Sequence, residues 1–186
     1  MNNVKDQLLA IHHLLDSHRT AMIGANDRPL IIVGCRAGFD NLLQTAQCLG
    51  ITVAGILDKY YPVGHEVNGL RVIGSEDILL EDSAEAQVFR DSHNFFPGTF
   101  WAGDQNLQNR GLDNGQVRLD RINMLDKSGV NVINLISPLI MYFPSYPNYD
   151  SSRFKVGRGV FIGEYTGITH DVEIGDYCYV DDLVCL

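Results

Sequence analysis

A six-residue pattern of aliphatic residues runs through the C-terminal part of the chain. From position 156 to the end, every sixth residue is β-branched or leucine: Val156, Ile162, Ile168, Ile174, Val180 and Leu186. Four positions later, a second column holds small or β-branched residues: Val160, Thr166, Val172, Cys178 and Val184. Two columns at this period predict a parallel β-helix, in which three hexads make one triangular turn around an aliphatic core.

The same pattern predicts how the turns of this β-helix are made and where it stops. The position after the first column is glycine at Gly157, Gly163 and Gly175, and we expect it to take the bend at each corner. The repeat fills one turn over residues 156–173 and part of a second over residues 174–186. Because an open solenoid end exposes apolar core, we expect an incomplete β-helix whose end is covered by further coils or by a partner.

The clearest strand–turn–helix signal lies upstream, between residues 30 and 57. The apolar run Leu30–Val33 is typical of a buried parallel strand. It enters a glycine-containing turn, residues 34–38, and then a helix that should end at Gly50. A second apolar strand over residues 52–57 follows. This order predicts a βαβ unit with a right-handed crossover.

Weaker patterns complete the predicted architecture. The remaining predictions are an amphipathic helix over residues 3–18, a strand over 70–74 with a helix N-cap at Ser75, a strand over 99–102, a helix over 117–128 ended by Gly129, and a return to the sheet over 131–136. The aromatic stretch 141–149 is expected to be a loop on the surface of the subunit, and its aromatic rings are expected to be covered by a neighbouring subunit. We therefore predict an N-terminal helix and loop (1–27), an α/β domain (28–136) and a linker with an incomplete β-helix (137–186).

Composition narrows the classes of function. The 186-residue chain has a net charge of -9, and its 14 lysines and arginines are scattered, which argues against a nucleic-acid partner. The N-terminus lacks the order of a signal peptide and no apolar stretch is long enough to cross a membrane, so we expect a cytoplasmic protein. The four cysteines show no C-x-x-C spacing, and the adjacent His12 and His13 would point apart on a helix. We expect buried free thiols and no metal site.

The glycine turn after the first strand is a candidate anion site. Such a turn directs backbone N–H groups and a helix N-terminus toward a phosphate. Gly34 and Gly38 form G-x-x-x-G, which falls short of the full dinucleotide pattern, and a plain tight turn remains the alternative. Asp58 ends the second strand, where an acid commonly binds a ribose hydroxyl. A nucleotide-bearing ligand is therefore indicated more strongly than a nicotinamide cofactor.

A histidine–aspartate pair inside the hexad region is the candidate catalytic group. Ile168 and Val172 belong to the two inward columns, so Thr169, His170 and Asp171 should face outward. An imidazole beside a carboxylate has a pKa suited to general-base catalysis near neutral pH. The alternative is an ordinary surface histidine.

With these residues in view, the sequence resembles bacterial sugar acetyltransferases of the left-handed β-helix class, which acylate nucleotide-linked 4-amino sugars, and their relatives described as sialic acid O-acetyltransferases. The resemblance rests on the blocks LIIVGCRAGFDNL, ITVAGILDK, VNGLRVIGSED, NLISPL and, most specifically, ITHDVEIGDYCYV. It implies that His170 is the catalytic base and that Asp171 orients or polarises it. It also implies a nucleotide-sugar pocket lined by Gly34, Cys35, Arg36, Ala37, Gly38, Asp58 and Lys59.

The resemblance further implies acetyl-coenzyme A as the acyl donor, no metal, and a homotrimer with the donor site between neighbouring β-helices. Family chains continue for several coils after the histidine–acid segment, and those coils make most of the contacts to coenzyme A. Our interpretation is a Rossmann-like α/β domain followed by the start of a left-handed β-helix, in a transferase that acetylates a sugar amine or hydroxyl. The alternatives are a non-catalytic nucleotide-sugar-binding or scaffold module with a vestigial β-helix and a nicotinamide-dependent oxidoreductase, which the incomplete glycine pattern disfavours.

Overall fold

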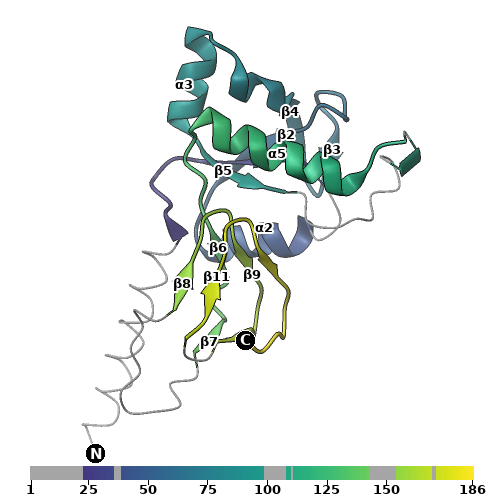
Figure 1. The fold of residues 1–186 in the computed structure, drawn as a ribbon. Coiled ribbons are helices and arrows are strands. Elements are labelled where there is room, and N and C mark those ends of the chain that lie inside the picture. The colour runs from purple at the N-terminus through teal and green to yellow at the C-terminus, as the bar shows by residue number, and fades with distance from the viewer. Residues whose placement is uncertain (1–22, 36–38, 99–107, 110, 143–153, 169–170) are drawn as a thin grey trace, which may run out of the picture. The chain divides into compact units, whose positions relative to one another are not determined.

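The computed structural model describes residues 23–35, 39–98, 108–109, 111–142, 154–168 and 171–186 (Figure 1). The chain divides into two compact units. We call residues 26–133 the α/β unit, and residues 134–186, together with residues 23–25, the coil unit. The predicted helix over 3–18 and the predicted strand over 99–102 lie outside the described residues.

The α/β unit is built on a five-stranded sheet in the order β3-β4-β2-β1-β5. Strand β1 (Leu30–Val33) is buried along its whole length and pairs in parallel with β2 (Val53–Leu57) and β5 (Asn94–Pro97). Strand β2 also pairs in parallel with β4 (Leu70–Gly74). Helix α2 (Phe39–Cys48) connects β1 to β2, so the predicted βαβ unit is confirmed.

One antiparallel strand and three helical segments complete this unit. Strand β3 (Glu66–Val67) pairs with β4 at the sheet edge. The 3₁₀ helix η1 (Glu76–Leu80) is capped by the Ser75 hydroxyl, as predicted, and α3 (Ala84–Ser92) by Ser83. Helix α5 (Asn114–Ser128) packs against η1 and ends at Gly129, which has a φ of 66°, as predicted. Helix α3 and strand β5 were not anticipated from the sequence.

Short strands in the coil unit stack in three parallel sets. The first set holds β6 (Leu135–Ile136), β9 (Phe161–Ile162) and β12 (Tyr179–Val180). The second holds β7 (Met141–Tyr142) and β10 (Gly167–Ile168), and the third holds β8 (Lys155–Val156) and β11 (Glu173–Ile174). Along the chain, every third strand returns to the same set, so each set is one side of a three-sided coil.

The coil begins two strands earlier than the hexad pattern predicts. Phe161 pairs with Tyr179, eighteen positions later, but Leu135 pairs with Phe161, twenty-six positions later. The first turn therefore holds eight extra residues, and these interrupt the six-residue period in the sequence. Two expectations were wrong. Residues 135–136 were expected in the α/β sheet, but Leu135–Ile136 forms the first strand of the coil, and only Val132 bridges to the sheet, at Phe95. Residues 141–142 were expected in an exposed loop, but Met141–Tyr142 is a strand of the coil.

Both hydrophobic columns point into the coil. Its core contains Ile136, Phe154, Val160, Ile162, Ile168 and Ile174, and the partly buried residues packed against it are Ile140, Val156, Val172, Cys178, Val180 and Leu186. Asn134 is buried at the start of the coil, where its amide nitrogen donates to the Gly157 carbonyl (2.7 Å) and its oxygen accepts from the Val160 N–H (2.8 Å). Stacked aliphatic side chains thus form the interior of this unit.

The bends of the coil lie elsewhere than at the predicted glycines. Every sixth residue takes a positive φ, at Gly159 (65°), Tyr165 (55°), Asp171 (63°), Tyr177 (58°) and Leu183 (61°). Gly157 and Gly163 instead make room for a neighbour, because a Cβ there would collide with the carboxylates of Asp176 and Asp182. These two aspartates accept hydrogen bonds from the backbone N–H groups of Arg158 and Glu164 in the previous turn.

The left-handed backbone at Leu183 generates a stability prediction. Its side chain is 78% exposed, so its replacement costs little burial, while a φ of 61° is unfavourable for leucine. We expect Leu183→Asn to stabilise the protein by about 1 kcal/mol, because asparagine tolerates this conformation. Leu183→Val should be destabilising by a similar amount, because its side chain is β-branched. Urea unfolding of both variants measures the difference, and an equal effect of the two would contradict the explanation.

Candidate functional site

The predicted binding residues gather at one edge of the α/β sheet. Strands β1, β2 and β4 are parallel, so the segments that follow them, 34–35, 58–61 and 75–77, lie at the same carboxyl edge. From β1 the chain crosses to β2 on one side and later returns to β5 on the other. Open α/β sheets bind ligands outside such a point. Residues 36–38 lie outside the described part of the chain, so Arg36, Ala37 and Gly38 receive no structural account.

Glycines allow a close approach where β1 and β5 end. Gly34 has a φ of 93°, and its N–H donates to the Leu57 carbonyl at 2.8 Å. Gly98, which follows β5, donates to the Val33 carbonyl at 2.9 Å, and a Cβ at Gly98 would collide with the Gly34 carbonyl oxygen. The sequence analysis did not identify Gly98. The close approach therefore requires glycine directly after β1 and directly after β5.

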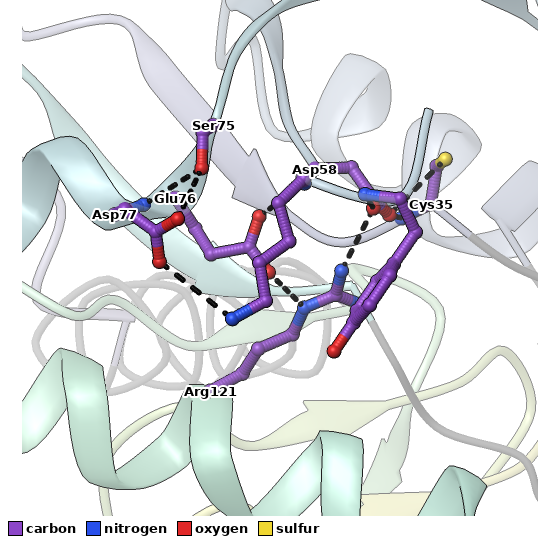
Figure 2. Close-up of polar contacts among 8 residues, drawn as sticks. Cys35, Asp58, Ser75, Glu76, Asp77 and Arg121 are labelled. Atoms are coloured by element: carbon purple, nitrogen blue, oxygen red, sulfur yellow. Dashed lines mark hydrogen bonds and ion pairs between the residues drawn. The ribbon is translucent and has the colours of Figure 1, made fainter. Parts of the chain in front are cut away.

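Asp58 lies at this edge, but its carboxylate is enclosed by protein. The residue is 1% exposed. One carboxylate oxygen accepts from the Cys35 N–H (3.1 Å) and lies 3.5 Å from the Cys35 sulfur. The other accepts from the Tyr60 N–H (2.9 Å) and lies 2.9 Å from an Arg121 guanidinium nitrogen. Figure 2 shows Asp58 between Cys35 on one side and Arg121 on the other.

Arg121 and Glu76 extend this arrangement, and neither was a predicted site residue. Arg121 comes from α5 and is 2% exposed, and its Nε donates to Glu76 at 3.0 Å (Figure 2). Glu76 is fully buried, and its second oxygen accepts from the Lys59 N–H. We call Cys35, Asp58, Glu76 and Arg121 the Arg121 cluster. A sequence signal was present, because Arg121 falls in the buried stripe of α5 with Val117, Met124 and Leu125.

The electrostatics of the cluster keep the guanidinium charged. Burial by itself lowers the pKa of Arg121, but the carboxylates of Asp58 and Glu76 more than offset this, and the pKa lies above its usual value. The guanidinium also lies 5.5 Å from the centre of the Tyr60 ring. With both carboxylates ionised, the cluster carries one net negative charge, which disfavours a ligand phosphate at this point.

Lys59 and Ser75 occupy the outer side of the same edge. The Lys59 ammonium lies 3.6 Å from an oxygen of Asp77, and 37% of the lysine side chain is exposed. The same ammonium lies 5.6 Å from the centre of the Tyr60 ring. The Ser75 hydroxyl both accepts from the Asp77 N–H and donates to the Asp77 carboxylate (Figure 2). Lys59 thus places a positive charge at the surface of an otherwise acidic edge.

The second candidate site lies in the coil unit. Ile168 is buried and Val172 is half-buried, and both contribute to the core, as predicted. Asp171 is exposed and takes a left-handed backbone with a φ of 63°. His170 lies outside the described residues. The structure therefore describes the acid of the predicted pair and gives no geometry for its histidine.

Other predicted features can be checked in the described part of the chain. No group of three or more His, Cys, Asp or Glu residues there could hold a metal ion. None of its helices is long and apolar enough to cross a membrane. Cys35 is buried, as expected for the free thiols, but Cys48 and Cys185 are exposed and Cys178 is half-buried. The expectation of buried thiols was wrong for Cys48 and Cys185.

Comparisons with known proteins identify the fold. No family model and no curated protein matches the chain. Among solved structures, it is similar to a His-to-Asn mutant of perosamine N-acetyltransferase from Caulobacter crescentus in complex with CoA and GDP-perosamine, with 18% identity, a TM-score of 0.57, and coverage of 83% of this chain and 63% of that one. It is also similar to the acetyltransferase domain of PglB from Neisseria gonorrhoeae in complex with acetyl coenzyme A, with 18% identity, a TM-score of 0.56, and coverage of 86% and 67%.

The fold is therefore one found in sugar acetyltransferases. The chain spans 63% of the length of the first of these structures. At this level of identity the likeness concerns the fold alone, and the activity follows below as a proposal.

The buried ion pairs generate a second stability prediction. Arg121→Met would leave two buried carboxylates without their cation, so we expect a loss of about 3–5 kcal/mol in the free energy of unfolding at pH 7.

Arg71→Met is the matched control for this measurement. Arg71 pairs with Glu66 at 2.9 Å, but the two side chains are 71% and 57% exposed. The control should therefore change stability by less than about 1 kcal/mol in urea unfolding at pH 7. Equal effects of the two substitutions would show that the buried charges do not stabilise the unit.

Proposed function

We propose that the protein is an acetyl-coenzyme A-dependent acetyltransferase acting on an amine or hydroxyl of a nucleotide-linked sugar, with a 4-amino sugar as the expected acceptor. One observation carries the proposal: a single chain joins a parallel α/β unit with a glycine turn to a three-sided coil that contains the His170–Asp171 pair. The likeness in fold to perosamine N-acetyltransferase and to the PglB acetyltransferase domain supports it.

Each unit is assigned a part in this function. The α/β unit is a Rossmann-like domain that binds the nucleotide-linked sugar at the carboxyl edge of its sheet, a choice supported by the crossover point beside β1. The coil unit is a left-handed β-helix: the return of the chain to the same side at every third strand supports the three-sided coil, and the left hand rests on the resemblance to the family. Trimer formation through the coil unit, with the donor site between subunits, rests on the resemblance to the family.

Binding residues follow from the sequence match and from the geometry of the edge. The turn from Gly34 to Gly38 and the N-terminus of α2 would lie beside the diphosphate. Gly34 and Cys35 would shape this turn without donating to the ligand, because their N–H groups already bind Leu57 and Asp58. The partly exposed Lys59 ammonium supplies positive charge beside them. Cys35 and Asp58 would contribute to the same edge by positioning its loops through their buried contacts.

Acetyl transfer requires a base at the acceptor atom and a leaving thiol. In the proposed reaction, His170 takes the proton as the acceptor nitrogen or oxygen adds to the thioester carbonyl. A new bond joins the acceptor to the acetyl carbon, the carbon–sulfur bond breaks, and the proton passes to the departing coenzyme A sulfur. Asp171 favours the charged imidazole that exists between these two proton transfers. The reaction needs no covalent acyl-enzyme and no metal.

Replacement of the base tests the catalytic part of the proposal. With acetyl-coenzyme A and the preferred nucleotide-linked amino sugar, His170→Ala should lower kcat by about a hundred-fold or more. Asp171→Asn should also lower kcat and move the acidic limb of the pH–rate profile to lower pH, because it removes a charge that raises the imidazole pKa. Release of free coenzyme A thiol measures both effects.

Glu173→Gln is the control for the charge at Asp171. Glu173 is an exposed carboxylate two positions away, paired with Lys155 at 3.7 Å, and its replacement should leave the profile unchanged. Full activity of His170→Ala would exclude His170 as the base.

Ligand titration tests the binding part of the proposal independently of catalysis. Calorimetry with UDP-, GDP- and dTDP-linked amino sugars should show binding to one of them, with NAD binding more weakly, because the glycine turn lacks the full dinucleotide pattern. Tight NAD binding with no response to the sugars would favour the oxidoreductase alternative. Sugar binding without acetyl transfer would favour the non-catalytic module.

A further inference from the structure

We propose that Asp58 is a positioning residue and that no ribose hydroxyl is bound by its carboxylate. The Arg121 cluster instead holds together the three loops at the carboxyl edge of the α/β sheet. The ligand part of this inference rests on the proposed function, in which a nucleotide-linked sugar binds at that edge. An acid at the end of the second strand ordinarily binds the ribose directly, so this assignment departs from the general rule.

The Asp58 carboxylate is enclosed by groups of the protein. An ionised carboxylate offers about four acceptor positions. Three donors hydrogen-bond to the Asp58 oxygens, namely the Cys35 N–H and thiol on one oxygen and the Tyr60 N–H on the other. The Arg121 guanidinium forms an ion pair with the second oxygen, with a nitrogen at 2.9 Å. At 1% exposure, a ribose hydroxyl would have to displace one of these groups and open the loop around it. The burial of the carboxylate and these contacts together close it to a ligand.

Each member of the Arg121 cluster comes from a different part of the α/β unit. Cys35 follows β1, Asp58 follows β2 and Glu76 follows β4. Arg121 reaches Asp58 and Glu76 from α5, and Cys35 joins the cluster through Asp58. Separating any two loops would leave a buried carboxylate or guanidinium without its partner, at a high cost in free energy. The cluster consequently fixes the relative positions of the loops that face the ligand.

Three backbone N–H groups at this edge already have partners within the protein. The N–H groups of Cys35, Lys59 and Tyr60 all bind buried carboxylates. These groups are therefore satisfied within the protein and are not available to a ligand phosphate. Anion binding is left to donors elsewhere on the edge, and the cluster determines how those donors are presented.

A comparison of nucleotides with and without ribose hydroxyls tests the role of Asp58. Calorimetry would measure the affinity of the wild type and Asp58→Asn for GDP and UDP and for their 2′,3′-dideoxy counterparts. We expect Asp58→Asn to weaken binding of both members of a pair by the same factor, so that their affinity ratio stays within about twofold of the wild-type ratio. A direct contact would instead collapse the ratio by about tenfold or more, which would overturn the proposal.

A second measurement keeps the inference testable if Asp58→Asn folds poorly or if no nucleotide binds. In the ligand-free protein, amide hydrogen exchange at Cys35, Lys59 and Tyr60 should be faster in Arg121→Lys than in the wild type, because a lysine cannot bridge Asp58 and Glu76 in the same geometry. Glu66→Gln, which breaks an exposed arginine pair, should leave these three amides unchanged.

The outcomes separate the inference from the function on which it rests. Unchanged exchange in Arg121→Lys would show that the cluster does not hold the loops, whatever the ligand. Failure of the wild type to bind any nucleoside diphosphate would contradict the proposed function, and exchange at the three amides would still decide the role of the cluster.

Discussion

The contact on which the α/β unit depends is the buried arrangement of one guanidinium between two carboxylates. Parallel strands bring loops from distant sequence positions to one edge but do not hold those loops together. Arg121 supplies the connection, since a planar guanidinium can bind Asp58 with one nitrogen and Glu76 with another. Such burial adds little net stability compared with an apolar core, but it ties the positions of these loops to one another.

The coil unit follows a different physical rule, in which each turn makes room for the next. Gly157 and Gly163 have no side chain because the carboxylates of Asp176 and Asp182 occupy that space and bind the backbone of the preceding turn. The glycines and aspartates thus form cross-turn pairs, and the aliphatic columns fill the interior between them. The cost of the sharp bends falls on Tyr165, Asp171, Tyr177 and Leu183, whose backbone is left-handed without the help of glycine.

Features of the fold that repeat or run continuously could be predicted from the sequence, and isolated ones could not. The hexad columns predicted the inward residues, and the run Leu30–Val33 predicted the buried parallel strand. The first two strands of the coil were missed because the extra residues before Lys155 break the six-residue period. Helix α3 was missed because its sequence is largely polar, and its Val88 is 68% exposed, so no apolar stripe marks it.

At the candidate site, the sequence predicted the positions of residues in the fold better than it predicted what their side chains contact. Asp58 was expected at the end of a strand and lies there, but whether an acid serves a ligand or the protein depends on what surrounds it. That environment includes Arg121, sixty-three positions away, and no local pattern links the two residues. An arginine within the apolar stripe of a helix is nevertheless informative, because a buried guanidinium needs carboxylates nearby. A charged residue in an apolar column therefore predicts that acids elsewhere in the chain are buried with it, and those acids are poor candidates for direct ligand contacts.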